Sequence, residues 1–202
     1  MPGSWGYIEK RYDEIYLGKS KLNYGTIRKR KEGGAFLDGF NVYDLGEFWH
    51  YISFGMSEIY EKESENRDVS GWGYEYSFKL KKGNEDKAPQ WVITPLQKLA
   101  RYVYNQCLPF DEAHFIPFGS AIIPDLNENL NSFIFSFDPI IGVIDTPTGS
   151  LKMLEIYCIS QKDIDFCFQS ELGSYQLIET IRKTNLGFIN DFSKSINYSD
   201  YV

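Results

Sequence analysis

Few residues of this chain could do chemistry, and the first candidate is a histidine preceded by two carboxylates. His114 follows Asp111 and Glu112, and an acid-rich approach to an imidazole can make a general base or contribute metal ligands. His50 instead stands among apolar residues in a strand-like alternation, which favours a hydrogen-bonded structural histidine. The chain has only two histidines and neither has a partner at a metal-binding spacing, so we expect no metal centre. A hydrolase acting through His114 with Asp111 or Glu112 is the alternative from another functional class.

The cysteines and short motifs add no further chemistry. The chain has three cysteines, Cys107, Cys158 and Cys167. Their odd number and the absence of CxxC spacing argue against a disulfide framework or a zinc site and favour a reducing compartment, with all three thiols in the core. Gly71-Trp-Gly73 lacks the third glycine of a dinucleotide turn, and a calcium loop starting at Asp125 fails at Leu130 and Ser136. We therefore expect no cofactor and no enzymatic activity.

Composition indicates one compact domain of acidic character. The chain has 202 residues, of which 43% are apolar and 17% aromatic, so it can bury about 70% of its unfolded surface. The net charge of 21 − 28 = −7 argues against a nucleic-acid or anionic-membrane surface. It is compatible with a basic protein partner, although acidity for solubility alone is the simpler interpretation. No signal sequence opens the chain and no run approaches a membrane span in length, so we expect a cytoplasmic protein.

The elements that would position these residues are organised around the stretch 71–106. Over 71–80, aromatic and aliphatic residues alternate with Glu75, Ser77 and Lys79, which is typical of a half-buried strand. From Thr94 the apolar residues recur at helical spacing, with Thr94 as N-cap and Gln97 completing a capping box. We expect the strand and the helix to pack on each other as one layer.

The rest of the chain predicts shorter elements around this unit. Helices are expected over 5–17, 163–172 and 175–183, and strands over 24–30, 40–45, 48–54, 133–137 and 151–160. The strands 48–54 and 151–160 are apolar on nearly every position, so both of their faces should be covered. The polar segment 61–70 predicts an exposed loop, and the basic run Arg28–Lys31 is interpreted as a solvated strand end.

Several blocks of the sequence, in order, resemble the Suppressor of fused domain family. They are Tyr24-Gly-Thr-Ile, Leu37-Asp-Gly, Trp49-His-Tyr-Ile-Ser-Phe-Gly, Gly71-Trp-Gly-Tyr-Glu, Leu99-Ala-Arg-Tyr, Asp138-Pro, Thr146-Pro-x-Gly and Leu177-Ile-Glu. The resemblance covers about residues 5–183. It implies an α+β fold, in which a mixed, mainly antiparallel sheet is flanked by helices, and no catalytic apparatus. We expect this domain over residues 1–184, followed by a tail, 185–202, that is either loosely ordered or packed on the body.

The resemblance also implies a binding function. Eukaryotic members of the family bind a transcription-factor peptide with the help of a second, C-terminal domain, and this chain ends before such a domain could begin. Stand-alone bacterial members look like immunity proteins, so the expected partner is a basic toxin domain that the acidic chain would steer toward itself. The alternative is a general scaffold or peptide-binding module that adds a strand to an exposed sheet edge. The oligomeric state and the identity of the partner are left open.

The same resemblance nominates partner-binding residues. A tyrosine and a phenylalanine that bind the peptide in eukaryotic members match Tyr102 and Phe110. The family's aspartate is replaced by Ala113, with Asp111 and Glu112 displaced by a residue or two. Tyr102 could equally belong to the core, whereas Phe110, in a loop beside a proline, is the better candidate for an exposed anchor.

Overall fold

One mixed sheet organises the fold in the computed structural model, which describes residues 3–119, 121–122, 129–185 and 187–192. The described strands lie in the order β1-β2-β3-β4-β8-β6-β5, with β7 added beside β8 and β9 beside β4. All pairs are antiparallel except β4 with β8 and β4 with β9. The predicted α+β class with a mainly antiparallel sheet is therefore confirmed.

The elements have the following bounds. The strands are β1 (Ser20–Gly25), β2 (Gly39–Asp44), β3 (Phe48–Phe54), β4 (Val69–Lys81), β5 (Phe115–Pro117), β6 (Leu130–Phe137), β7 (Val143–Thr146), β8 (Gly149–Ser160) and β9 (Ile189–Asn190). The helices are α1 (Trp5–Ile15), α2 (Ile93–Gln106), α3 (Gln161–Cys167) and α4 (Gly173–Thr184), with short 3-10 turns at Arg30–Glu32 and Gln90–Val92.

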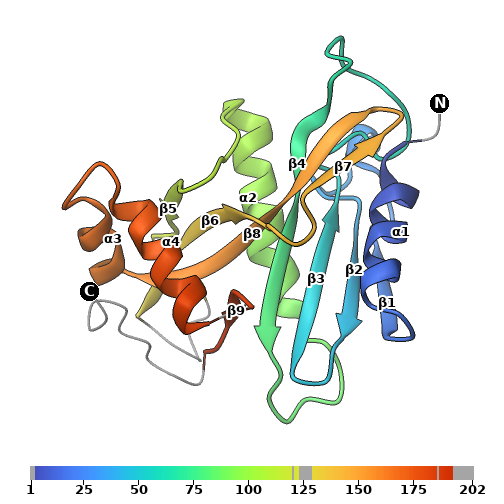
Figure 1. Cartoon of the computed structure of the whole chain (residues 1–202). Coiled ribbons are helices and arrows are strands. Elements are labelled where there is room, and N and C mark those ends of the chain that lie inside the picture. The colour runs from blue at the N-terminus through green and yellow to red at the C-terminus, as the bar shows by residue number, and fades with distance from the viewer. Residues whose placement is uncertain (1–2, 120, 123–128, 186, 193–202) are drawn as a thin grey trace.

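Helices cover both faces of the sheet. On one face α2 packs against the aromatic side of β4 and the facing residues of β3, β6 and β8, which form the largest apolar cluster. On the other face α1 packs over β2, β3 and β8, while α3 and α4 pack over β6 and β8. Figure 1 shows α2 behind the sheet and α1 and α4 in front of it. Because the side chains of a strand alternate between faces, β2, β3 and β6 each contribute to two apolar clusters and β8 to all three, whereas β4 contributes only to the cluster beneath α2.

The burial of β4 differs from the prediction. The alternation of residues predicted a half-buried strand, yet Glu75, Ser77 and Lys79 are as buried as their aromatic neighbours. Their face of the sheet is covered by α1, α4 and the loops that follow β3 and β6. A polar face that is buried must find internal hydrogen bonds and ion pairs, and these bonds shape the interior described below.

The start of α2 also differs from the prediction. The helix begins at Ile93, directly after a 3-10 turn, and no side chain caps it. The capping box is wrong because Gln97 binds elsewhere: its Oε1 accepts the N–H of Leu37 at 3.0 Å and its Nε2 donates to the carbonyl of Leu37 at 2.8 Å. Gln97 thus ties α2 to the loop before β2.

Other boundaries are mostly as expected. The helix predicted over 5–17 is α1, and the strands 48–54 and 151–160 are β3 and β8, buried on both faces. The strand predicted at 24–30 is wrong, since β1 ends at Gly25 and the basic run lies in a loop and a 3-10 turn. Helix α3 ends at Cys167, earlier than predicted. Residues 125–128, which begin the rejected calcium loop, lie outside the described residues.

The described part of the predicted tail packs on the body. Strand β9 pairs with β4 just past the point where the pairing of β4 with β8 ends. The side chain of Asn190 bridges the two diverging strands: it accepts the N–H of Cys158 at 2.7 Å and donates to the carbonyls of Lys79 and Ile156 at 3.1 and 3.0 Å. Residues 193–202 lie outside the description.

Candidate protein-binding surface

His50 is a structural histidine, as predicted. Its imidazole is fully buried between α1 and the sheet, where Nδ1 lies 2.9 Å from the hydroxyl of Tyr16 and Nε2 lies 2.7 Å from the hydroxyl of Ser77. Burial, followed by the positive charge of the neighbouring Lys79, holds the pKa of His50 well below its ordinary value. The ring therefore stays neutral and serves as a hydrogen-bonding strut.

Glu75 organises the loop that follows β3. Its buried carboxylate accepts the hydroxyls of Ser53 and Ser57, both at 2.6 Å, and the N–H groups of Gly55, Met56 and Ser57 at 2.9, 3.2 and 2.9 Å. Burial raises the pKa of Glu75, although these five hydrogen bonds favour the ionised form and act to lower that pKa. With all its acceptor positions turned inward, this carboxylate shapes the loop and faces no solvent.

A second buried network joins α4 to the sheet. The ammonium of Lys79 lies 2.5 Å from one carboxylate oxygen of Glu155 and 3.6 Å from Asp138, and Arg182 of α4 lies 2.9 Å from the other oxygen of Glu155. Asp138 also accepts the N–H of Ile140 at 2.8 Å. Two cations and two anions balance here, as burial requires, so the network holds α4 in place.

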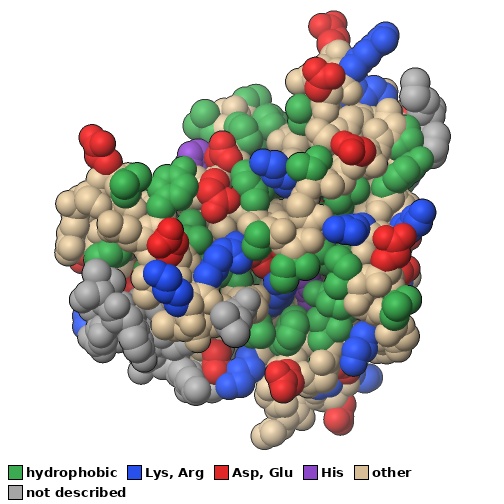
Figure 2. All heavy atoms as spheres, in the orientation of Figure 1, with side chains coloured by type: hydrophobic (Ala, Val, Ile, Leu, Met, Phe, Trp, Pro, Cys, Tyr) green, Lys and Arg blue, Asp and Glu red, His purple; other side chains and the backbone are tan. Residues whose placement is uncertain are grey.

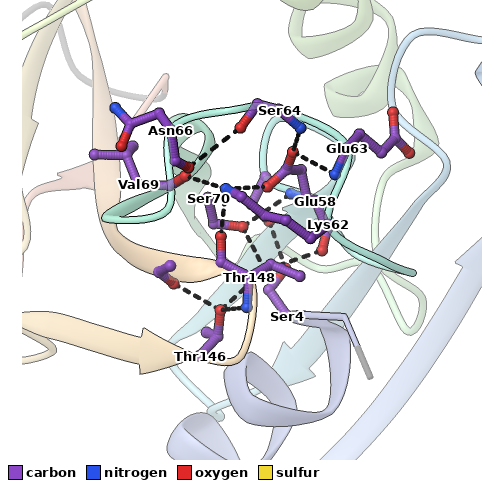
Figure 3. Close-up of polar contacts among 12 residues, drawn as sticks. Ser4, Glu58, Lys62, Glu63, Ser64, Asn66, Val69, Ser70, Thr146 and Thr148 are labelled. Carbon is purple, nitrogen blue, oxygen red and sulfur yellow. Dashed lines mark hydrogen bonds and ion pairs between the residues drawn. The ribbon is translucent and has the colours of Figure 1, made fainter. Parts of the chain in front are cut away.

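A third polar cluster fastens the long loop after β3 to the turn between β7 and β8, as Figure 3 shows. The ammonium of Lys62 donates to the carboxylate of Glu58 at 2.8 Å and to the carbonyls of Val69 and Thr148, both at 2.7 Å. Burial acts to raise the pKa of Glu58, but Lys62 and two backbone N–H groups outweigh it and lower that pKa. The hydroxyl of Thr148 lies 2.8 Å from that of Ser70, so the Thr146-Pro-Thr-Gly block has a structural use.

The histidine and carboxylates proposed for hydrolysis are not brought together. His114 is exposed, and its Nδ1 accepts the backbone N–H of Asp111 at 3.1 Å. The carboxylate of Glu112 turns away and accepts the hydroxyl of Ser136 at 2.7 Å and the N–H of Phe137 at 2.6 Å. Since neither carboxylate is bonded to the imidazole, these residues form a braced turn against β6 and do not make an acid–base pair.

The exposure of the two predicted aromatic anchors is reversed. Phe110 is only 8% exposed, so its assignment as the exposed anchor is wrong; its ring stacks on Phe135 with centroids 4.2 Å apart. Tyr102, which could have been core, is 39% exposed and stacks on the outer side of Phe110 at 5.8 Å. Phe110 therefore supports Tyr102 from below. Ala113, at the place of the family's aspartate, is buried with φ +61°.

These residues surround a hollow beside β5, the last strand of the sheet on this side. The hollow has a volume of about 440 Å³ and is lined by Tyr102, Leu108, Pro109, Phe110, Ala113, His114, Phe115 and Ile116. Leu108 is 57% exposed, and sequence reasoning missed it, although its place beside a proline after α2 could have indicated it. We call this region the β5-edge surface. It presents apolar side chains next to a strand edge, which suits a protein ligand.

Another hollow of about 510 Å³ lies near the loop 55–64 and is bordered by Tyr104, which is also close to the C-terminal end of α2. Lys29 lies over the ring of Tyr60 at 3.8 Å and Arg30 over that of Tyr104 at 4.2 Å. Carboxylates also line it, so its charges are mixed and do not select a ligand class.

The described part of the chain contains no metal-binding cluster and no disulfide. No group of three or more His, Cys, Asp or Glu side chains is placed there to hold a metal ion. Cys158 and Cys167 are buried free thiols, and burial raises the pKa of the Cys158 thiol. Cys107 is exposed at the end of α2, so its prediction as a core residue is wrong. Among the described helices, none is long and apolar enough to cross a membrane.

The fold and the surface define an α+β domain with a helix-covered mixed sheet and an apolar edge surface. The family model described as "Suppressor of fused protein (SUFU)" matches residues 36–193. The human and mouse Suppressor of fused homologs are each 28% identical over 148 residues, which cover 68% of this chain and 30% of those proteins. The chain therefore belongs to the Suppressor of fused family, while spanning less than a third of the length of these curated relatives.

Solved structures show the same fold. A chain of the Sufu–Fu complex crystal structure has a TM-score of 0.85 at 22% identity, covering 99% of this chain and 94% of that one. The putative SUFU homolog from Neisseria gonorrhoeae has a TM-score of 0.61 at 13% identity, covering 95% and 94%. At these identities the likeness concerns the fold.

Proposed function

We propose that this chain is a non-catalytic, cytoplasmic protein-binding domain that acts as a bacterial immunity protein and neutralises a cognate toxin domain by tight binding. The observation that carries the proposal is the β5-edge surface, where large apolar side chains stand exposed beside a strand edge. The net charge of −7 favours a basic toxin, because opposite charge speeds association and aids discrimination.

The predicted partner-binding residues take different roles in this proposal. Tyr102 and Asp111, which are exposed, contact the partner directly, together with Leu108. Phe110 holds the ring of Tyr102 in place, and Glu112 braces the turn through Ser136 and Phe137. A rigid aromatic side chain on a packed support loses little entropy on binding, which is typical of interface hot spots.

The test is co-expression of this chain with the toxin domain encoded immediately upstream of it, followed by affinity measurement with the purified pair. We expect rescue of growth and a 1:1 complex, and Tyr102→Ala should weaken that complex by about tenfold or more. Tyr7→Ala is the matched control, since Tyr7 on α1 is 41% exposed and lies away from the surface. Capture of the toxin without loss of its toxicity would count against the proposal.

A second candidate function is a scaffold that binds peptides by adding a strand. It is favoured by the short terminal strand β5, whose outer edge adjoins the hollow. Gene neighbourhood separates the two: an adjacent toxin gene favours immunity, and a housekeeping operon favours the scaffold.

A further inference from the structure

The turn between α3 and α4, together with the first turn of α4, exposes three large apolar side chains that the core does not use. Phe168, Leu172 and Tyr175 are 75%, 61% and 49% exposed. The core on this side is built from other residues of the two helices, among them Ile164 and Leu177. We call the three exposed residues the α3–α4 ridge. Single exposed apolar residues are ordinary, but several in one turn mark an interaction site.

The ridge is held rigidly. A side chain at Gly173 would place its Cβ 2.4 Å from the carbonyl oxygen of Cys167, so the two helices meet in close backbone contact. The ring of Phe168 packs edge-on against Phe115 of the β5-edge surface, with centroids 5.3 Å apart. The ridge therefore adjoins the β5-edge surface and needs little ordering on binding, which favours affinity.

Charge identifies the kind of partner. Between Asp163 and Ile181 the sequence contains no lysine or arginine, whereas Asp165 and Glu171 are both exposed beside the ridge. Among the described residues, Glu171 has no ion pair. Figure 2 shows hydrophobic and acidic side chains next to each other over the α3–α4 turn. The ridge thus offers apolar contacts within a negative rim.

We propose that the α3–α4 ridge is a second docking surface, which binds a protein face carrying apolar side chains rimmed by lysine or arginine. A second copy of this chain would bring two acidic rims together, and an anionic membrane would be repelled in the same way. The partner's chemistry matches the basic toxin domain, so the inference rests on the proposed function and deepens it. The partner would contact the ridge and the β5-edge surface together.

The test uses the purified chain and the toxin domain encoded beside it. Phe168→Ala with Leu172→Ala should weaken the complex by about tenfold or more, and Glu171→Lys should weaken it most at low salt, where charges are least screened. Leu17→Ala, at a residue 80% exposed on the opposite side, and Glu65→Lys, in the exposed 61–68 loop, are the matched controls and should bind as wild type. Thermal unfolding confirms that each variant is folded.

The outcomes separate the two proposals. If the ridge variants bind like wild type while Tyr102→Ala weakens the complex, the proposal that the ridge is a docking surface is refuted and the proposed immunity function stands. Equal losses in the ridge and control variants would also overturn the ridge, because the effect would then not be local. If the wild-type chain binds no neighbouring toxin, both proposals are overturned.

Discussion

Replacing Gly149 by alanine should destabilise the fold much more than replacing Gly142, although both glycines flank β7 and both have positive φ. The φ angles are +110° at Gly149 and +66° at Gly142. A Cβ at Gly149 would lie 2.6 Å from the carbonyl carbon of Val69 and 2.8 Å from its nitrogen, whereas a Cβ at Gly142 meets nothing within 4 Å. The pair therefore compares a glycine that has both close backbone contact and backbone strain with one that has backbone strain alone.

The magnitudes follow from these two terms. Alanine at Gly142 faces only the cost of a left-handed backbone, about 1–2 kcal/mol. Alanine at Gly149 adds a collision with the backbone of β4, and overpacking of this kind costs about 1–3 kcal/mol. Relief of the collision would shift Thr148, whose carbonyl accepts the ammonium of Lys62 at 2.7 Å, at a cost of about 1 kcal/mol. The total for Gly149→Ala is about 3–6 kcal/mol, a large share of a typical folding free energy.

Urea unfolding followed by tryptophan fluorescence measures both variants. We expect unchanged m-values, a modest shift of the midpoint for Gly142→Ala, and a shift at least twice as large for Gly149→Ala. Equal losses of unfolding free energy in the two variants would refute the reasoning, because the approach of the β7–β8 turn to Val69 would then be soft.

Three further predictions use the polar interior. Lys62→Met should cost about 2–4 kcal/mol of unfolding free energy, because it leaves the buried Glu58 without its cation. Folding lowers the pKa of Glu58, so wild type loses stability in acid as this carboxylate becomes protonated, and the variant should lack that part of the acid-dependent loss. The stabilising effect of His50, measured as wild type against His50→Gln, should shrink by up to about 1.4 kcal/mol per pH unit as pH falls below the ordinary histidine pKa, because the unfolded chain then takes up a proton that the folded ring refuses; a difference independent of pH would contradict it. Gln97→Ala should lose about 1–3 kcal/mol in urea unfolding through its two bonds to Leu37, and a loss below a few tenths would show that water replaces them.

The helices and strands could largely be predicted from local patterns, but which residues bond to each other across the fold could not. The periodicity from Leu96 to Val103 predicted α2 correctly, because helical spacing is a property of the segment itself. The capping box at its start was wrong because Gln97 has a better partner in Leu37, sixty residues away in sequence. A pattern in one segment does not reveal competition from another.

Burial posed the same difficulty for β4. Alternating Glu75 and Ser77 look like a solvent face, and only the placement of α1 and the neighbouring loops turns that face inward. The exposure of Tyr102 and Phe110 was predicted the wrong way round for a related reason. The ring of Phe110 stacks on Phe135 in the core, and the ring of Tyr102 stacks on the outer side of Phe110. Exposure depends on tertiary neighbours that the spacing of residues does not specify.

The buried ionisable groups of the described interior are used to hold the fold together. A catalytic side chain must have an unmet bonding capacity directed at a substrate, yet the imidazole of His50 and the carboxylate of Glu75 direct theirs at other parts of the fold. Glu155 likewise binds two cations of the chain itself. Bonds of this kind hold loops and helices at fixed places on the sheet. Among the described residues, the two proposals place the contacts with another molecule on exposed side chains at the β5 edge, Asp111 included, and on the α3–α4 turn.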